Sequence, residues 1–316
     1  MTGEIEISIV APCFNEEECI EEFIRRLSIV LLQLGVTNEI ILIDDGSRDN
    51  TLNKLNQLSN EYPNLVIISF SRNFGHQPAV TAGLDNAKGK AIVLIDADLQ
   101  DPPEVIIEMY KKWKTGTDVV YGQRKTRKGE SWFKLLTAKL FYKLIQYMTD
   151  CDIPMNTGDF RLIDSKVAVH LNSLREKHRF IRGMVSWVGF RQDDVQYDRD
   201  PRFAGETKYP FIKMFKFSID AITSFSILPL RLMIMAGFGT VGISVIWSIV
   251  TVIRRLIHPE IFIPGYTATV LLIVFFGGIQ LMATGLIGEY IGRIYEEIKK
   301  RPLYIIDKIF RSEDKE

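Results

Sequence analysis

Two aspartates one residue apart, Asp96 and Asp98, follow a short apolar run at residues 91–95 and are the side chains best suited to chemistry. Carboxylate and phosphate oxygens are the ligands that hard divalent cations such as Mg²⁺ and Mn²⁺ prefer. A nucleotide is itself an anion, so an acidic pocket that binds one needs a cation between the two. The Asp-x-Asp pattern therefore predicts that Asp98, with Asp96 beside it, holds Mg²⁺ or Mn²⁺.

Polar residues also follow two earlier apolar runs of the chain. Residues 12–16 come after the first run, and Asp44 and Asp45 come after the second. A single aspartate in such a place is more often a helix cap or a turn residue, and Asp45 and Asp101 suit that role. The Asp-x-Asp motif, at a strand end like the other polar clusters, is what favours a functional site.

The first 125 residues alternate short β-rich runs with amphipathic helical patterns, and this alternation must position the polar clusters. The predicted strands are 5–11, 39–43, 65–69, 91–95 and 118–122, and the predicted helices are 16–34, 51–59, one from about 77, and 103–115. The series predicts an α/β domain with a parallel sheet, in which ligands bind beyond the carboxyl ends of the strands. No G-x-G-x-x-G follows the first strand and the chain has no G-x-x-x-x-G-K-[ST], so dinucleotide and P-loop sites lack specific support.

The formal net charge of zero conceals a division of charge along the chain. Residues 1–110 carry 18 acidic and 7 basic side chains, whereas residues 111–316 carry 21 acidic and 32 basic ones. A hydrophobic content of 47% with 22 Gly and 12 Pro excludes collagen-like and broadly disordered chains. The zero total argues against a uniformly basic nucleic-acid binder. Three cysteines match neither a closed disulfide framework nor a zinc site.

Two long runs without a charged side chain occupy the C-terminal part, 22 residues at 232–253 and 23 residues at 266–288. At about 1.5 Å per helical residue, each run is long enough to cross a hydrocarbon core of about 30 Å. They predict a transmembrane hairpin, with a buried hairpin of a large soluble domain as the alternative. Basic residues flank the hairpin mainly on the side of both chain ends, which predicts that the rest of the protein is cytoplasmic.

The predicted organisation therefore has four parts. A cytoplasmic catalytic domain at 1–205 is followed by a juxtamembrane amphipathic segment at 206–230, two transmembrane helices within 231–290 and a cytoplasmic tail at 291–316. This describes a multi-pass protein of the inner (plasma) membrane. Small residues in the hairpin permit close contact between helices, so we also expect a homo-oligomer, for example a tetramer.

The motifs APCFNEE, IDDGSRDNT, VLIDADLQDPP, YGQR and RFAGETKYP together resemble those of family-2 glycosyltransferases of the polyprenyl-phosphate type. SRNFGHQPAVTAGLDNA, TGDFRLID and RFIRGMVSWVGF, followed by a two-helix hairpin, look most like the bacterial bactoprenol (undecaprenyl-phosphate) glucosyltransferases that supply glucose for O-antigen modification. These enzymes are related to dolichol-phosphate mannosyltransferase. The resemblance spans residues 5 to about 300, and Cys13 departs from it by standing where the family usually has an aromatic residue.

The resemblance implies a GT-A-like, Rossmann-related domain that binds a nucleotide sugar through Mg²⁺ or Mn²⁺. The residues that it implies for the nucleotide are Pro12, Asp44, Asp45 and Asp96, with Glu16 in support. Those for the metal are Asp98 and Gln100, together with Asp96. Those near the acceptor and donor phosphates are Arg124, Arg202 and Lys208, and Asp159 stands where related enzymes place an acid close to the sugar.

The implied reaction is an inverting transfer of a hexose, and our hypothesis is transfer of glucose from UDP-glucose to undecaprenyl phosphate. A lipid monophosphate is largely a dianion at neutral pH, so it is nucleophilic without a strong base. Asp159 is therefore as readily a sugar-hydroxyl ligand as a base, and pairing with Arg161 is its structural alternative. The competing functions are a mannosyltransferase that uses GDP-mannose and a non-catalytic, membrane-anchored nucleotide-sugar-binding protein. A processive synthase would need more spans and a Q-x-x-R-W motif, which the chain lacks.

Overall fold

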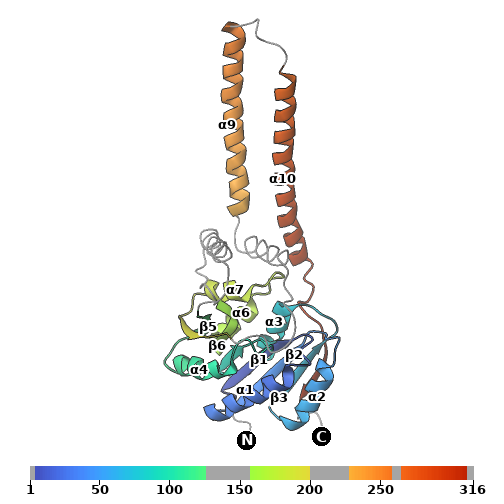
Figure 1. Ribbon diagram of the computed structural model, residues 1–316, viewed down its shortest axis with the longest axis vertical. Helices are drawn as coiled ribbons and strands as arrows, with labels where there is room; N and C mark the ends of the chain where they lie inside the picture. Colours follow the sequence, from blue (N-terminus) through green and yellow to red (C-terminus); the bar gives the residue numbers. More distant parts are fainter. Residues whose placement is uncertain (1–3, 126–156, 200–227, 258–264, 312–316) are drawn as a thin grey trace. The chain divides into compact units, whose positions relative to one another are not determined.

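The computed structural model describes residues 4–125, 157–199, 228–257 and 265–311 (Figure 1). The chain divides into two compact units, one of Met1–Tyr147, Cys151–Lys216 and Pro302–Glu316, the other of Met148–Asp150 and Phe217–Arg301. We call the first the sheet unit and the second the helical unit. Because the sheet unit includes both ends of the chain, the helical unit is an insertion within its sequence.

A sheet of eight strands, as far as the described residues show, organises the sheet unit in the order β7-β5-β6-β4-β1-β2-β3-β8. The strands are β1 (Ile7–Cys13), β2 (Asn38–Asp44), β3 (Leu65–Phe70), β4 (Ala91–Leu94), β5 (Val119–Arg124), β6 (Thr157–Asp164), β7 (Gln192–Tyr197) and β8 (Ile306–Arg311). β1 pairs in parallel with β2 and β4, β2 with β3, and β5 with β7. β6 is antiparallel to β4 and β5, and β8 is antiparallel to β3. The predicted α/β class with a mostly parallel sheet is confirmed.

Helices follow most of the strands of the sheet unit. They are α1 (Ile20–Leu34), α2 (Thr51–Glu61), α3 (His76–Asn86), α4 (Ile106–Lys114), α6 (Ser165–Ser173) and α7 (Ile181–Trp187), with a 3₁₀ turn η1 (Pro103–Val105) before α4. α1 begins four residues later than predicted, because the chain first makes a turn in which Cys19 N donates to Glu16 O. It ends where Gly35, at φ 63°, donates its N–H to Leu31 O, a left-handed C-cap.

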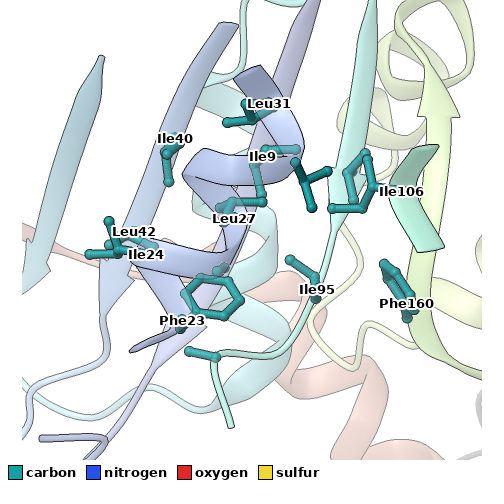
Figure 2. Packing of buried hydrophobic residues seen from close by; sticks show 14 of the residues in the cluster. Ile9, Phe23, Ile24, Leu27, Leu31, Ile40, Leu42, Ile95, Ile106 and Phe160 are labelled. Atoms are coloured by element: carbon teal, nitrogen blue, oxygen red, sulfur yellow. The ribbon is translucent and has the colours of Figure 1, made fainter. Parts of the chain in front are cut away.

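The main core lies between the sheet and the apolar face of α1. Phe23, Ile24, Leu27 and Leu31 recur at helical spacing and are buried. Figure 2 shows them packed with buried residues of the strands, of the chain directly after β4 and of α4, among them Ile9, Ile40, Leu42, Ile95 and Ile106. Burial of each such side chain contributes about 1.5–3 kcal/mol, so this face fixes α1 on the sheet.

The opposite face of the sheet carries α3, which approaches the strands closely at Gly83. A Cβ on Gly83 would lie 2.1 Å from Val10 Cγ1 and 3.0 Å from Ile43 Cδ1, so only glycine fits there. Successive residues of β1 point to opposite faces, and Ile9 accordingly faces α1 while Val10 faces α3. With both faces covered, the carboxyl ends of the strands are left for polar residues.

The helical unit contains α9 (Leu228–Ile257) and α10 (Tyr266–Ile298), of 30 and 33 residues. The charge-free runs at 232–253 and 266–288 lie inside these two helices. Across the part of the chain that the structure covers, no helix has the length and apolarity needed to cross a membrane. Of the predicted amphipathic segment at 206–230, residues 206–227 lie outside the described residues.

The C-terminal residues differ from the predicted tail at 291–316. α10 continues to Ile298, and residues 306–311 form β8 at the edge of the sheet, beside β3. The segment includes Asp307 and Lys308, and an edge strand with one exposed side tolerates such charged residues. Residues 302–311 therefore belong to the sheet unit.

Candidate active site

The carboxyl ends of parallel strands bring several of the predicted site residues to one edge of the sheet. Asp44 is the last residue of β2 and lies opposite Cys13, the last residue of β1. Asp96 follows two residues after the end of β4, and Arg124 is the last residue of β5. The fold thus places carboxylates from two strands and a guanidinium from a third on the side where α/β proteins bind ligands.

The Asp-x-Asp loop has a constrained backbone. Asp98 Oδ1 accepts a hydrogen bond from Gln100 N at 3.1 Å. Leu99 between them has a φ of 58°, an unusual value for a bulky residue, and its side chain is buried. Such a conformation persists only when the surroundings impose it, as they often do at functional sites. Burial and the neighbouring Asp96 carboxylate raise the pKa of Asp98, which reflects negative charge that a cation would offset.

His76, the first residue of α3, links two of the predicted carboxylates. Its Nε2 lies 2.8 Å from Asp96 Oδ1 and its Nδ1 lies 3.8 Å from Asp159 Oδ2. Burial disfavours the charged imidazole, but the Asp96 and Asp159 carboxylates outweigh it and raise the pKa of His76 to about 9. At neutral pH His76 is therefore a cation between two anions.

Asp159, on β6, is held from its other side by Arg182 of α7. Arg182 Nε donates to Asp159 Oδ1 at 2.6 Å, and Arg182 Nη1 donates to Thr157 O at 3.1 Å. Although burial opposes ionisation, the Arg182 guanidinium and His76 hold the pKa of Asp159 well below its usual range. Asp96, His76, Asp159 and Arg182 form one row of alternating charge, which we call the carboxylate network.

Asp44 and Asp45 lie side by side but make different contacts. Asp44 accepts from Ser47 N at 3.2 Å and from Ser69 Oγ at 3.4 Å. Both carboxylate oxygens of Asp45 accept hydrogen bonds from the loop before α3, one from Phe74 N at 2.6 Å and one from Gly75 N at 2.9 Å. Asp45 thus anchors the segment that leads into His76.

A second polar cluster surrounds Asp101, whose side chain is 1% exposed. Arg124 Nη2 lies 3.4 Å from Asp101 Oδ1, and Arg199 Nε lies 3.7 Å from the same oxygen. Tyr197 donates its hydroxyl to Asp101 and accepts from Arg124 Nε at 3.2 Å. The buried carboxylate of Asp101, three residues after Asp98, therefore pairs with two guanidinium groups. Two positive charges face one negative charge, so the cluster carries a net positive charge.

The remaining predicted residues fall into two groups. Pro12 is part of β1, and Glu16 donates its backbone N–H to Thr51 Oγ1 at 2.9 Å in the turn before α1. Arg202 and Lys208 lie outside the described residues. Cys13, where the family usually has an aromatic residue, is buried at the end of β1.

The donors near the Asp-x-Asp loop suit a hard cation by their chemistry. Asp96, Asp98 and Gln100 supply carboxylate and amide oxygens, the donors that Mg²⁺ and Mn²⁺ prefer. In the described portion of the chain, no group of three or more His, Cys, Asp or Glu residues is arranged to hold a metal ion.

Residues 8–171 match the family described as glycosyl transferase family 2. YkcC of Bacillus subtilis, an uncharacterized glycosyltransferase, is 50% identical over 315 residues, which cover 100% of this chain and 97% of that protein. The bactoprenol glucosyl transferase of Shigella phage SfII is 41% identical over 307 residues, which cover 97% and 99% of the two chains. The chain therefore belongs to glycosyltransferase family 2, and the predicted family and enzyme class are confirmed.

Among solved structures, the chain is similar to the glucosyl-3-phosphoglycerate synthase of Mycobacterium tuberculosis, crystallised with Mn²⁺, UDP and glucosyl-3-phosphoglycerate. The identity is 19% and the TM-score 0.47, over 69% of this chain and 77% of the other.

Sequence reasoning missed four residues that the structure brings to the site: His76, Arg182, Tyr197 and Arg199. His76 stands inside the motif SRNFGHQPAVTAGLDNA, and a histidine at the start of a helix after a strand was the available signal. Arg182 stands inside the motif RFIRGMVSWVGF, but its partner Asp159 is 23 residues away, and Arg199 is 98 residues from Asp101, so no local pattern indicates either pairing.

Proposed function

We propose that this protein transfers glucose from UDP-glucose to undecaprenyl phosphate, with inversion at the anomeric carbon. The observation that carries the proposal is the carboxylate network beside Asp98, at the carboxyl edge of a family-2 glycosyltransferase sheet. The bactoprenol glucosyl transferase of phage SfII, similar over nearly the whole length of both chains, supports glucose as the sugar and a polyprenyl phosphate as the acceptor.

Asp98, Asp96 and Gln100 would hold Mg²⁺ or Mn²⁺ in this proposal. The cation supplies an offset to the negative charge that develops on the departing nucleoside diphosphate. Asp44, one strand away, would accept hydrogen bonds from the nucleotide. Arg124, whose side chain is 15% exposed beside Asp101, would attract substrate phosphate through its guanidinium.

Asp159 is better suited to align the sugar than to remove a proton. A carboxylate that is paired with Arg182 at 2.6 Å and faces His76 is a weak base, because both cations favour its ionised form. The acceptor needs little activation, because a phosphate monoester is already largely a dianion at neutral pH. We therefore assign Asp159 to sugar hydroxyls and the nucleophilic attack to the lipid phosphate oxygen.

Attack from the face opposite the leaving diphosphate would convert an α-linked donor into a β-linked lipid product. In this scheme the protein's main task is to hold two phosphate-bearing substrates in line despite their mutual repulsion. The Arg124 and Arg199 pair, with its surplus positive charge, lowers that repulsion.

We further propose that α9 and α10 form a membrane hairpin that keeps the sheet unit at the cytoplasmic face. As described, the two helices lack the length and apolarity needed to cross a membrane. This proposal therefore rests on the sequence, which has charge-free runs of 22 and 23 residues flanked by basic residues. Retention in the membrane pellet after alkaline carbonate extraction tests this part, and release into the supernatant would overturn it. Chemical cross-linking in detergent tests the predicted homo-oligomer.

The decisive experiment uses the full chain in proteoliposomes with undecaprenyl phosphate, labelled UDP-glucose and Mg²⁺ or Mn²⁺. We expect a labelled lipid product that depends on the cation and falls at least about 100-fold in Asp98→Asn. Asp193→Asn, at an exposed carboxylate paired with Lys112, is the matched control and should retain activity. GDP-mannose in a parallel reaction tests the mannosyltransferase, and UDP binding without any lipid product would favour the non-catalytic alternative.

A further inference from the structure

The segment after α10 returns to the sheet unit and lies against the region that leads into α3. β8 pairs antiparallel with β3, from Val66 opposite Arg311 to Phe70 opposite Ile306. The pairing continues beyond the strand, because Ser71 N donates to Ile305 O at 3.1 Å. This segment, which we call the C-terminal brace (residues 302–311), therefore lies along the chain that connects β3 to His76.

The brace holds the C-terminal end of α3 through Asp85. Tyr304 donates its hydroxyl to Asp85 Oδ2 at 2.7 Å. Arg175 donates to both Asp85 oxygens at 2.8 Å, and Lys177 Nζ donates to Pro302 O at 3.3 Å. Asp85 is the penultimate residue of α3, so the Tyr304 bond ties that end of the helix directly to the brace, while Arg175 and Lys177 join the helix end and the brace to the segment after α6.

The same tyrosine also supports the N-terminal side of α3. Its ring stacks on Phe70, with centroids 5.2 Å apart and planes 9° apart, and Phe70 meets the edge of Phe74 at 5.7 Å. Phe74 and Gly75 in turn donate their N–H groups to Asp45. The aromatic contacts therefore end at Phe74, two residues before His76 of the carboxylate network.

Between its two ends, α3 is fixed to the sheet at Gly83, where no side chain separates it from Val10. Residues 79–84 of α3 are buried, whereas residues 76–78 and 85–86 at its two ends are only partly buried and depend more on contacts from other elements. Tyr304 contributes to holding both ends. We propose that Tyr304 is a positioning residue, which acts through α3 to keep His76 between Asp96 and Asp159.

The test is a double-mutant cycle on kcat, and it rests on the proposed transfer activity. Tyr304→Phe removes the bond to Asp85 but keeps the ring stack, and Tyr304→Leu removes both. We expect kcat to fall about tenfold in Tyr304→Leu and less in Tyr304→Phe, with the KM for the donor nearly unchanged, because a small displacement of the site affects the reaction more than binding. In a His76→Gln background, Tyr304→Leu should add little, since the residue that it positions is already gone.

The matched control is Tyr110→Phe on α4. It removes another tyrosine hydroxyl that donates to a carboxylate, in this case Glu6 Oε1 at 3.1 Å. It should lower stability by an amount similar to that of Tyr304→Phe but leave kcat unchanged. Equal kcat losses in the Tyr304 and Tyr110 variants, or full additivity of Tyr304→Leu with His76→Gln, would overturn the proposal.

Hydrogen exchange separates this inference from the proposed function, since it needs no turnover. We expect Tyr304→Leu to speed exchange of the amides in the first turns of α3, such as those of Ala79 and Val80, whereas Tyr110→Phe should not. If the wild-type chain makes no lipid product, the proposed function fails and the exchange result alone decides the role of Tyr304. Unchanged exchange in Tyr304→Leu would refute the positioning role even in an active enzyme.

Discussion

At the scale of single residues, the site is a row of opposite charges in which each group restrains the next. Asp96 meets His76 at 2.8 Å, and Asp159 meets Arg182 at 2.6 Å, with His76 and Asp159 3.8 Å apart. Removing one member leaves its neighbour partly buried without its partner, which costs more than the pair contributes net. The arrangement therefore fixes the positions of these four side chains, and substitution of any one of them is expected to be destabilising.

Arg182→Gln should lower the free energy of unfolding by about 1.5–3 kcal/mol at neutral pH, because Asp159 loses a charged hydrogen bond. The pKa of Asp159 is depressed in the folded protein, so its stabilisation is present above the unfolded value of 3.8 and lost as the pH falls below it. The stability gap between wild type and variant should therefore shrink on acidification. Urea unfolding at several pH values measures it.

The double variant Arg182→Gln/Asp159→Asn provides the check on this explanation. It removes both charges and leaves two amides that can hydrogen-bond to each other. We expect it to be more stable at neutral pH than Arg182→Gln alone. A double variant no more stable than the single one would show that the ion pair is not the cause.

The Asp-x-Asp pair was predictable because both residues stand in one local motif at a strand end. His76, Arg182 and Tyr197 were not, because they meet their partners only after distant elements have packed. For Asp45 the sequence left two roles open, a cap or turn residue and a nucleotide ligand. In the structure both of its oxygens accept backbone N–H groups of the loop before α3, which agrees with the first role.

At the scale of elements, close contacts between backbone segments determine the positions of the polar loops. Gly46, after β2, has a φ of 65°, and a Cβ there would lie 2.6 Å from the backbone carbon of Arg72 and 2.7 Å from Asn73 N. The loop after β2 and the loop before α3 are therefore in direct contact. This contact places Asp44 and Asp45 next to the segment that carries His76.

Gly46→Ala should destabilise the sheet unit by about 2–5 kcal/mol, because it adds a steric clash to an unfavourable left-handed backbone. Gly35→Ala is the matched control: its φ is 63°, but a Cβ there meets nothing within 4 Å. The control should cost only about 1–2 kcal/mol, from the backbone alone. Thermal unfolding followed by circular dichroism compares the two, and equal losses would contradict the clash.

The strands β1 to β5 were predicted within two residues of their observed bounds, because apolar runs between turn residues are a strong local signal. β6 was read only as a motif, TGDFRLID, although it enters the sheet between β4 and β5. Its place depends on pairing with two strands far away in sequence, which no local pattern records. The segment of β8 was predicted as part of a tail, because its pairing with β3 likewise depends on a strand far away in sequence.

At the scale of the whole molecule, both ends of the chain meet in one sheet, and β8 covers the outer edge of β3. An open edge strand is a template for pairing with other chains. Removal of residues 302–316 would uncover β3 and also remove Tyr304. The charge-free runs predicted a four-part chain that ends in a tail, and the return of residues 306–311 to the sheet was not predicted.

A chain that ends at Arg301 should therefore be less stable and should self-associate or aggregate. A chain that ends at Arg311 keeps β8 and is the control, which should behave as the full-length protein does. Light scattering during size-exclusion chromatography in detergent compares the two. Identical elution of both shortened chains would show that β8 does not protect the edge.

The position of β8 also sets the order of events during synthesis. β1 to β4 are complete by Leu94, whereas β8 spans Ile306–Arg311 of a 316-residue chain. At about 5–20 residues per second, translation leaves the growing protein with an unfinished sheet for many seconds. All of the helical unit emerges from the ribosome within that interval. If α9 and α10 enter the membrane as proposed, a nascent chain is anchored there before its sheet closes, and molecular chaperones would meet β3 in its open form.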